Sequence, residues 1–345
     1  MAGGSGERFW PMSRALAPKH LLRLFSERTL LEETIERVRG VVAEGNIWIL
    51  TNESQIPLIA EALPAFPRQQ IVSEPEKRDT APAASLATGL VRARDPDAVL
   101  ALLPADALIR NGARFSEQLA QAFAWAGGGS NGLLTFAVPP TRAATGFGYL
   151  ELGAELARGG DGSRLIRVKR FVEKPDEETA RAYVSSGLYA WNAGMFVWSA
   201  RAFLAEVERT APELAAFIRG FPGGDPAPYL SARFARLPKT SVDYAVLEKA
   251  SSVATVLAEF DWDDAGTWTA LAKHLPVDAS GNVTRGPVFT AGTTGTIAVS
   301  NGRVIALCGV RDLVVVETPD ALLVCHRDSV QDIKSLMPLL PKETL

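Results

Sequence analysis

The amino-terminal residues combine the two chemical features that bind a polyphosphate. Gly3, Gly4 and Gly6 lie within four positions, and backbone N–H groups without a neighbouring Cβ can approach an anion closely. Arg8 and Lys19 add positive charges just beyond the glycines. The segment is not a Walker A motif, because no Gly-Lys-Ser/Thr follows, and it lacks the preceding strand of a dinucleotide fingerprint. The pattern favours a triphosphate loop over a flexible glycine-rich tail.

Asp106 follows the apolar run Val99–Leu103, which reads as a buried strand. Ligands of open α/β sheets bind at the carboxyl ends of the strands, and a carboxylate there is well placed to hold a divalent metal. The alternative is that Asp106 only caps a turn, where aspartate is common. The residue alone leaves both interpretations open.

A second acidic cluster, Asp261, Asp263 and Asp264, is interleaved with Trp262 and followed by Trp268. Three carboxylates this close repel one another unless a cation or hydrogen-bond donors compensate. A solvated acidic turn is the alternative. Because the two tryptophans are expected to be buried nearby, the sequence favours at least one metal or donor contact.

Glu173 and Lys174 also follow a predicted strand, and Pro175 would end that strand and open a helix. Their charges would then be fixed at the edge of the sheet, although a surface ion pair is the usual alternative. Gly148 and the Asn192–Gly194 segment place glycines where the backbone could approach a polar ligand such as a sugar. Each of these alone is also compatible with a simple turn.

Strands and helices alternate through the first two-thirds of the chain, which predicts βαβ units and a mostly parallel sheet. Thr29 and Glu32 form a candidate capping box at the first helix. The strands are expected at 47–50, 99–103, 133–138, 164–172 and 194–198, and the helices at 30–42, 81–94, 115–126 and 176–186.

After His274 the pattern changes to short strands at the spacing of an all-β unit, expected at 296–299, 304–307, 313–317 and 322–325. Asn301-Gly302 predicts a tight turn, and a final helix is expected at 329–340. We expect two domains, an α/β domain over residues 1–277 and a β domain over 278–345.

Composition excludes several classes of function. Hydrophobic residues make up 47% and charged residues 22%, as in ordinary globular proteins. The net charge of −3 argues against a nucleic-acid surface. No apolar run reaches membrane-spanning length and no signal peptide opens the sequence, so no membrane partner is expected. Cys308 and Cys325 have no metal-ligand spacing and are expected to be reduced core residues of a cytoplasmic protein.

Taken together, the motifs and their order along the chain resemble the sugar-nucleotide pyrophosphorylase (nucleotidyltransferase) family, particularly its members that use GTP and mannose 1-phosphate. The motifs that carry the resemblance are 3–14, Pro18-Lys19, 78–83, 103–106, 146–149, 171–175, 191–196, 241–249 and 262–266. The resemblance implies an α/β fold, a doubly wound Rossmann-like mixed sheet, followed by a short left-handed β-helix. It also implies that GMP is transferred from GTP to mannose 1-phosphate, giving GDP-mannose and pyrophosphate.

The resemblance further assigns roles to individual residues. Arg8, Lys19 and Asp106 are the implied catalytic residues, and Mg²⁺ would be held by Asp106 and Asp264. The implied nucleotide-binding residues are Ala2, Gly3, Gly4, Gly6, Arg8, Lys19, Arg78, Asp79, Thr80 and Asp106. The implied sugar-phosphate-binding residues are Gly148, Glu173, Lys174 and Asn192. A homodimer is expected.

Two alternative functions remain at this point. The chain could use another pair of substrates, glucose 1-phosphate with dTTP or UTP, but residues 78–83 and 191–196 argue for guanine and mannose. It could also be a non-catalytic regulatory subunit. Such subunits tend to lose the charged residues, which are all present here.

One departure concerns the strand that precedes the glycine-rich loop in relatives. Here only Met1 stands before the loop. Without a central strand, its neighbours would lack backbone partners. We therefore expect that translation starts upstream of Met1, and that a chain beginning at Met1 would fold and bind nucleotide less well.

Overall fold

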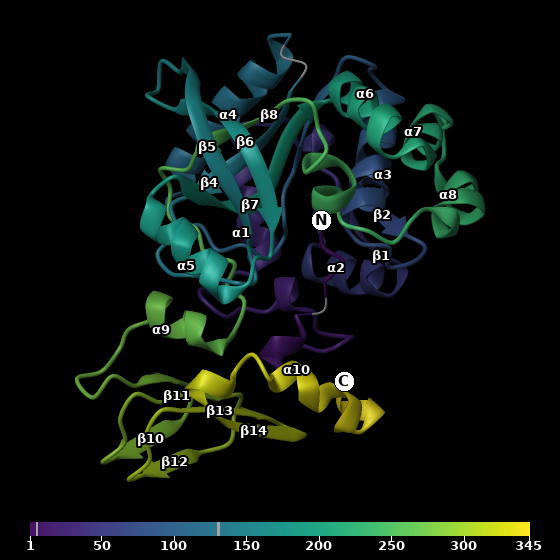
Figure 1. Ribbon diagram of the computed structural model, residues 1–345. Coiled ribbons are helices and arrows are strands. Elements are labelled where there is room, and N and C mark those ends of the chain that lie inside the picture. The colour runs from purple at the N-terminus through teal and green to yellow at the C-terminus, as the bar shows by residue number, and fades with distance from the viewer. Residues whose placement is uncertain (5, 130–131) are drawn as a thin grey trace.

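The computed structural model describes residues 1–4, 6–129 and 132–345. An N-terminal α/β part forms the larger body of the molecule, and a smaller β part lies against one end of it (Figure 1). The N-terminal segment passes between the two parts before it enters the first helix. Ser5, which belongs to the glycine-rich loop, lies outside the described residues.

The central sheet of the α/β part has the strand order β3-β7-β4-β8-β6-β5. The strands are β3 (Val99–Leu102), β4 (Leu133–Val138), β5 (Gly148–Arg158), β6 (Arg164–Glu173), β7 (Tyr189–Ser199) and β8 (Val253–Leu257). Strands β4 and β8 pair in parallel and the other pairs are antiparallel. The mixed sheet implied by the resemblance is therefore confirmed.

The expectation of a mostly parallel sheet, drawn from strand–helix alternation, is wrong for this central sheet. Parallel strands need a long crossover connection, whereas a short turn joins strands that run antiparallel. Strands β5 and β6 are joined by such a turn, in which Gly159 N–H donates to Ser163 O at 2.8 Å. Alternation of strands and helices along the sequence does not reveal this connection.

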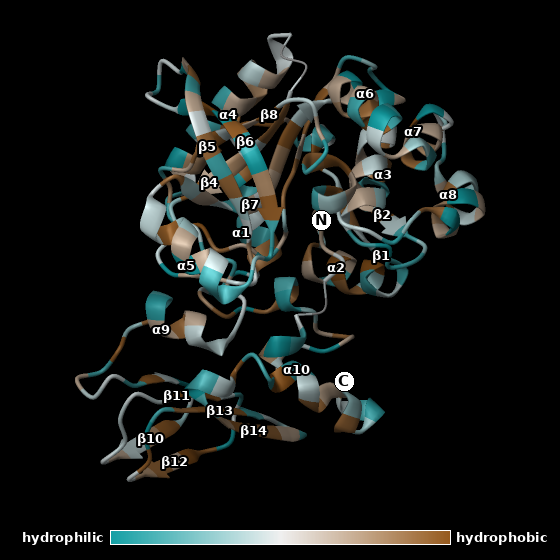
Figure 2. Cartoon of the chain, in the orientation of Figure 1, coloured by the Kyte–Doolittle hydropathy of each residue, from teal (hydrophilic) through white to brown (hydrophobic). Residues whose placement is uncertain are grey.

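Helices cover both faces of this sheet, and the hydrophobic residues gather on the strands that they cover (Figure 2). The helices from the start of the chain to the β part are α1 (Leu30–Arg39), α2 (Ile56–Ala62), α3 (Thr80–Arg92), α4 (Gly112–Gly127), α5 (Glu177–Ser186), α6 (Ala200–Thr210), α7 (Pro212–Arg219), α8 (Ala227–Arg233) and α9 (Leu271–His274). Helix α9 does not cover the sheet but lies toward the β part (Figure 1). Helix α1 begins with the predicted capping box: Glu32 N donates to Thr29 Oγ1 at 3.1 Å, and Thr29 N donates to Glu32 Oε2 at 2.6 Å.

Strands β1 (Ile49–Asn52) and β2 (Ile71–Glu74) form a separate parallel pair. A largely apolar cavity of about 710 Å³ is lined by β1, β3 and residues of α1, α3 and α4. Met1 and Ala2 also line it and connect β1 to the segment that follows β3: Met1 O accepts from Ala105 N at 2.9 Å, and Ala2 N donates to Leu50 O at 2.7 Å.

The C-terminal part is built from parallel ladders, as expected for a β-helix. Strands β9 (Val283–Arg285), β11 (Ile297–Ser300) and β13 (Leu313–Thr318) form one ladder, and β10 (Val288–Ala291) pairs with β12 (Ile305–Cys308) in another. Strand β14 (Ala321–His326) closes the first ladder antiparallel to β13. The turn at Asn301-Gly302 therefore joins strands of different ladders.

Two expectations for this part need correction. Cys308 is exposed, which contradicts the expectation, whereas Cys325 is partly buried at the edge of the apolar cluster of the β part; both are free thiols. They lie on β12 and β14, where successive side chains alternate between the inside and the outside of the sheet. The final helix is also broken: α10 spans only Ile333–Leu336, and 3₁₀ turns precede and follow it.

The two parts share one apolar cluster. Phe9 and Trp10, which follow the glycine-rich loop, pack with Trp268 and with β-strand residues such as Val299 and Val314. The ring centroids of Phe9 and Trp268 are 5.0 Å apart. Trp10 Nε1 donates to Thr344 O at 2.9 Å. In the described part of the chain, no helix combines the length and apolarity needed to cross a membrane.

Candidate active site

The glycine-rich loop, Asp106 and Asp264 meet at the side chain of Lys19. This side chain is almost fully buried, and its ammonium donates to Asp106 Oδ2 at 3.0 Å, to Asp106 O at 3.1 Å and to Asp264 O at 2.7 Å. One cation thus connects three segments that are far apart in the sequence. Arg8 lies exposed on the short 3₁₀ turn Glu7–Phe9 beside the loop, where its charge is free to meet an anion.

Gly6 gives the loop a shape that other residues would not tolerate. Its φ of 71° lies in the left-handed region, and a Cβ at this position would lie deep inside van der Waals contact with Cβ of Lys19. We expect Gly6→Ala to lower kcat/KM at least about tenfold, because it displaces Lys19 or the loop. Steady-state kinetics measure this loss.

Gly4→Ala is the matched control. Gly4 is exposed, and a Cβ added at this position would have no other atom within 4 Å. This variant should keep the melting temperature of the wild type, and any rise in its KM for the nucleotide would report a close approach of the ligand. Equal activity of Gly6→Ala and wild type would contradict the account of Gly6.

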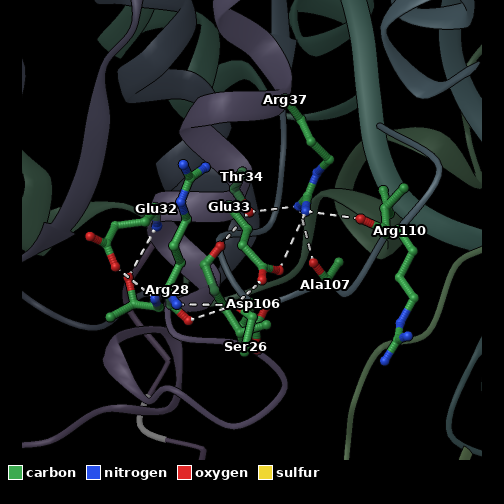
Figure 3. A network of polar contacts seen from close by, with 12 residues as sticks. Ser26, Arg28, Glu32, Glu33, Thr34, Arg37, Asp106, Ala107 and Arg110 are labelled. Carbon is green, nitrogen blue, oxygen red and sulfur yellow. Dashed lines mark hydrogen bonds and ion pairs between the residues drawn. The ribbon is translucent and has the colours of Figure 1, made fainter. Parts of the chain in front are cut away.

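Arg37 on α1 holds the segment that carries Asp106 (Figure 3). Its guanidinium donates to Ala107 O at 3.1 Å and to Ile109 O at 3.4 Å, and it also donates to Thr34 Oγ1 at 2.9 Å. Burial lowers the pKa of Arg37 to about 10, so it remains charged at neutral pH. The position of Asp106 therefore depends on a residue of a different element.

We expect Arg37→Met to lower the free energy of unfolding by about 2–3 kcal/mol, because charged hydrogen bonds to two buried carbonyl groups are lost. Arg39→Met on the same helix is the control. Arg39 pairs with Glu36 and Glu44 at the surface, and exposed pairs contribute about 0–1 kcal/mol. Urea unfolding of both variants measures the difference, and equal losses would contradict the role given to Arg37.

The three acidic residues of the second cluster have different partners. Asp261 accepts hydrogen bonds from the backbone N–H groups of Arg110 and Asn111, at 2.7–3.1 Å. Asp263 contacts Lys273 and His274, each at 3.1 Å. Burial by itself would raise the pKa of Asp263, but these contacts outweigh it and hold that pKa well below its usual range. Donors thus compensate two of the three carboxylates, as expected.

The third carboxylate, Asp264, accepts no hydrogen bond from the described residues, and its charge interacts with those of Lys19, Arg142 and Asp106. Burial, followed by the charge of Asp263, raises its pKa, and the charges of Lys19 and Arg142 oppose that rise. A divalent cation between Asp264 and Asp106 would relieve this repulsion. Carboxylate oxygens are hard ligands, and two of them suit a metal whose other positions are filled by phosphate and water. Nucleotidyltransferases of this type generally use a divalent metal. Among the described residues, no three acidic, histidine or cysteine side chains form a complete metal cage.

The predicted base-binding segment begins α3. Arg78 donates to Leu237 O at 3.0 Å, and the Asp79 carboxylate caps the helix by accepting from Thr80 N at 2.7 Å. Thr80 Oγ1 accepts from Val242 N at 2.9 Å. This segment is therefore joined directly to residues 240–242, which lead into the predicted sugar pocket.

The predicted sugar-phosphate residues also lie together. Glu173 and Lys174 form an ion pair, and a Cβ on Gly148 would come within 2.5 Å of Glu173 Oε2. Asn192 accepts from Thr135 Oγ1 at 2.6 Å, so its Nδ2 points the other way and donates to Asp243 Oδ1 at 3.1 Å.

Asp243 is a functional candidate that the sequence did not identify. It opens a π-helical turn, Asp243–Leu247, a feature frequent at functional sites. It lies in one of the motifs of the resemblance, but nothing in the sequence shows that it contacts Asn192. Burial, and then the charge of Glu173, raise the pKa of Asp243 from 3.8 to about 7, although Lys174 opposes them.

This raised pKa predicts a pH-dependent stability. Between about pH 4 and pH 7 the folded protein keeps a proton that the unfolded chain releases, so stability falls as the pH rises through this range. Asp243→Asn removes the titration and keeps an acceptor oxygen for Asn192. We expect the melting temperature of this variant, relative to wild type, to increase between about pH 5 and pH 8. A difference that does not change with pH would contradict this assignment.

Strained backbone conformations occur at or next to several of the predicted site residues. Among the described non-glycine residues, positive φ angles occur at Asp79 (68°), Lys174 (49°), Ala265 (43°) and Asp312 (54°). The first two are predicted site residues and the third follows Asp264. Such conformations persist only where the surroundings enforce them, and they concentrate at functional sites.

Comparison with known proteins agrees with this fold and this grouping of residues. A family model described as "Nucleotidyl transferase" matches residues 1–280, and the chain therefore belongs to the nucleotidyl transferase family. A second model, described as "MannoseP isomerase/GMP-like beta-helix domain", matches residues 286–340. Within the family, the chain groups with proteins named mannose-1-phosphate guanylyltransferase.

The relatives are similar over nearly the whole chain. The mannose-1-phosphate guanylyltransferase of Klebsiella pneumoniae is 37% identical over 99% of this chain and 73% of its own length. That of Escherichia coli K12 is 36% identical, over 98% and 72%. A solved Thermus thermophilus structure, described as a mannose-1-phosphate geranyltransferase, has a TM-score of 0.87 and 32% identity and covers 98% of this chain and 97% of its own. The alternative substrate pairs and the regulatory role are not favoured.

Proposed function

We propose that this protein transfers GMP from GTP to the phosphate of α-D-mannose 1-phosphate, forming GDP-mannose and pyrophosphate, with Mg²⁺ as the divalent metal. The observation that carries the proposal is the Lys19 ammonium, which joins the glycine-rich loop to Asp106 and Asp264. The grouping with proteins named for this reaction supports the choice of substrates.

The reaction needs alignment of two phosphates and no protein base. A phosphate monoester has a second pKa of about 6, so the sugar 1-phosphate is already largely dianionic at neutral pH. One of its oxygens attacks the α-phosphorus of GTP in line, a P–O bond forms, and the bond to the β-phosphate breaks to release pyrophosphate. Catalysis then depends on positioning and on relief of charge repulsion.

Different residues bind the two substrates. Gly3, Gly4 and Gly6 offer backbone donors to the triphosphate, and Ala2, whose own N–H donates to Leu50 O, anchors the start of the loop. Arg8 and Lys19 add positive charge, and Arg78, Asp79 and Thr80 border the base. Gly148, Glu173, Lys174 and Asn192 orient the sugar phosphate. Mg²⁺ between Asp106 and Asp264 would neutralise charge on the reacting phosphates.

Release of pyrophosphate tests the proposal. The purified protein is incubated with Mg²⁺ and each pair from a panel of GTP, UTP, dTTP and ATP with mannose 1-phosphate and glucose 1-phosphate. We expect GTP with mannose 1-phosphate to be the best pair. Preference for UTP or dTTP with glucose 1-phosphate would overturn the substrate choice, and no turnover of any pair would overturn the enzymatic function.

The proposal includes a homodimer and a cytoplasmic location. The C-terminal part exposes several large apolar side chains, which support a contact between copies; these are Phe289, Val304, Leu322 and Val324. Light scattering on the purified protein tests the dimer. Both cysteines are free thiols, which suits a reducing compartment.

A further inference from the structure

Arg142 is an exposed cation beside the candidate active site, and no role has been given to it so far. It belongs to the loop between β4 and β5, and its guanidinium lies over two aromatic rings, 5.5 Å from the centroid of Phe147 and 5.8 Å from that of Trp191. In the described part of the chain, no carboxylate forms an ion pair with it. The two rings hold its charge in place. That charge opposes the rise in the pKa of Asp264, but Arg142 has no ion-pair partner among the described residues.

The aromatic rings place Arg142 between the sugar pocket and the acidic cluster. Phe147 packs edge-on against Trp191 at 5.1 Å and against Trp262 at 5.6 Å, between ring centroids. Trp191 immediately precedes Asn192 on β7, and Trp262 lies two residues before Asp264. An anion bound by Arg142 would therefore lie where the sugar phosphate meets the reacting centre.

The loop that carries Arg142 is anchored at both ends. Ala144 N donates to the Tyr149 hydroxyl at 2.9 Å and to Arg142 O at 3.0 Å. Lys174 N donates to Phe147 O at 3.2 Å, which joins the loop to the Glu173–Lys174 pair. The side chain is thus largely ordered before a ligand arrives, and less conformational entropy is lost on binding.

We propose that Arg142 binds the phosphate group of the sugar 1-phosphate, with the stacked guanidinium presenting its N–H edge to two phosphate oxygens. A guanidinium lying on an aromatic face keeps that planar edge free, and bidentate contact with phosphate is the chemistry in which arginine exceeds lysine. The indole N–H of Trp191 is buried and has no hydrogen-bond partner among the described residues, so it supplies a second donor nearby. Arg8 and Lys19 already supply positive charge to the triphosphate, which leaves the sugar phosphate as the anion for Arg142. This inference rests on the proposed function.

Arg142→Met is the test, with Arg94→Met as the matched control. Arg94 also lies over a tryptophan ring, 4.2 Å from the ring centroid of Trp48, but it follows α3, lines the apolar cavity and has no role in the proposed site. We expect Arg142→Met to raise KM for mannose 1-phosphate about 10- to 100-fold, the equivalent of one charged hydrogen-bonding contact. KM for GTP and the melting temperature should stay close to wild type. Arg142→Lys should restore only part of the loss, and Arg94→Met should leave both KM values unchanged.

An unchanged KM for mannose 1-phosphate in Arg142→Met, or an equal rise in KM for GTP, would overturn the inference. Calorimetric titration with mannose 1-phosphate and with glucose 1-phosphate tests the role of Arg142 separately from the proposed choice of substrate. Binding of glucose 1-phosphate alone, lost in Arg142→Met, would keep the role of Arg142 and reject the proposed substrate. Failure of the wild type to bind either compound would overturn both.

Discussion

Replacing Asp264 or Asp106 by alanine is expected to abolish GDP-mannose synthesis while the protein stays folded. The charge of Asp264 interacts with those of Lys19 and Arg142, and burial, followed by the charge of Asp263, raises its pKa. Asp106 is partly exposed, and its carboxylate accepts a hydrogen bond from the Lys19 ammonium. Loss of charge stabilisation at a phosphate-transfer centre lowers kcat by about 10²–10³ or more. Pyrophosphate release measures turnover, and circular dichroism with thermal melting measures folding.

Asp261→Asn is the control for this first prediction. Asp261 accepts hydrogen bonds from the backbone of Arg110 and Asn111, and an asparagine oxygen can still accept them. Its effect on turnover should therefore be small. Wild-type synthesis of GDP-mannose by Asp264→Ala or Asp106→Ala would contradict the metal assignment.

Lys19→Met is expected to have the second largest effect, a fall in kcat of about 10²–10³ at high substrate concentration. The near-isosteric methionine removes the charge that lies against Asp106 and against the backbone oxygens of both aspartates. Lys19→Arg should not restore activity, because the bulky guanidinium does not fit a buried site that directly adjoins Gly6. Single-turnover kinetics with saturating GTP measure this step.

Lys273→Met is the control for the lysine. Lys273 also contacts an aspartate of the acidic cluster, Asp263 at 3.1 Å, but its side chain is largely exposed. We expect this variant to turn over within about threefold of wild type, because exposed ion pairs contribute little. A large loss in Lys273→Met together with a small one in Lys19→Met would reverse the roles given to the two lysines.

Local features were predictable from the sequence because their causes are local. The capping box of α1 depends on Thr29 and Glu32, three positions apart, and strand β4 was predicted with its observed bounds because five of its six residues are apolar and Pro139 follows it. The carboxyl end of β3 likewise indicated Asp106, since strand ends and ligand sites coincide in open sheets. The order of the motifs along the chain then indicated the nucleotidyltransferase fold.

The order of the strands and the long-range contacts of the site depend on the tertiary structure, which a single sequence does not reveal. Strand β7 lies between β3 and β4, which precede it in the chain, so its neighbours follow from the tertiary fold. Arg37 reaches Ala107 across seventy residues, and Asn192 reaches Asp243 across fifty-one. Arg142 could not be singled out in the sequence, because its aromatic partner Trp191 lies on β7, far from the loop of Arg142 in the chain. Each of these side chains acquires its role only when the sheet brings the elements together.

The cluster formed by Phe9, Trp10 and Trp268 has a consequence for how such proteins can be recombined. Trp10 follows the glycine-rich loop, and its indole N–H donates to Thr344 O near the last residue of the chain, while Trp268 Nε1 donates to Trp10 O. A chimera that exchanges only the C-terminal part would pair this loop with foreign apolar partners. Because the residues that follow the glycine-rich loop pack on the β part, we expect the two parts to vary together rather than as interchangeable modules.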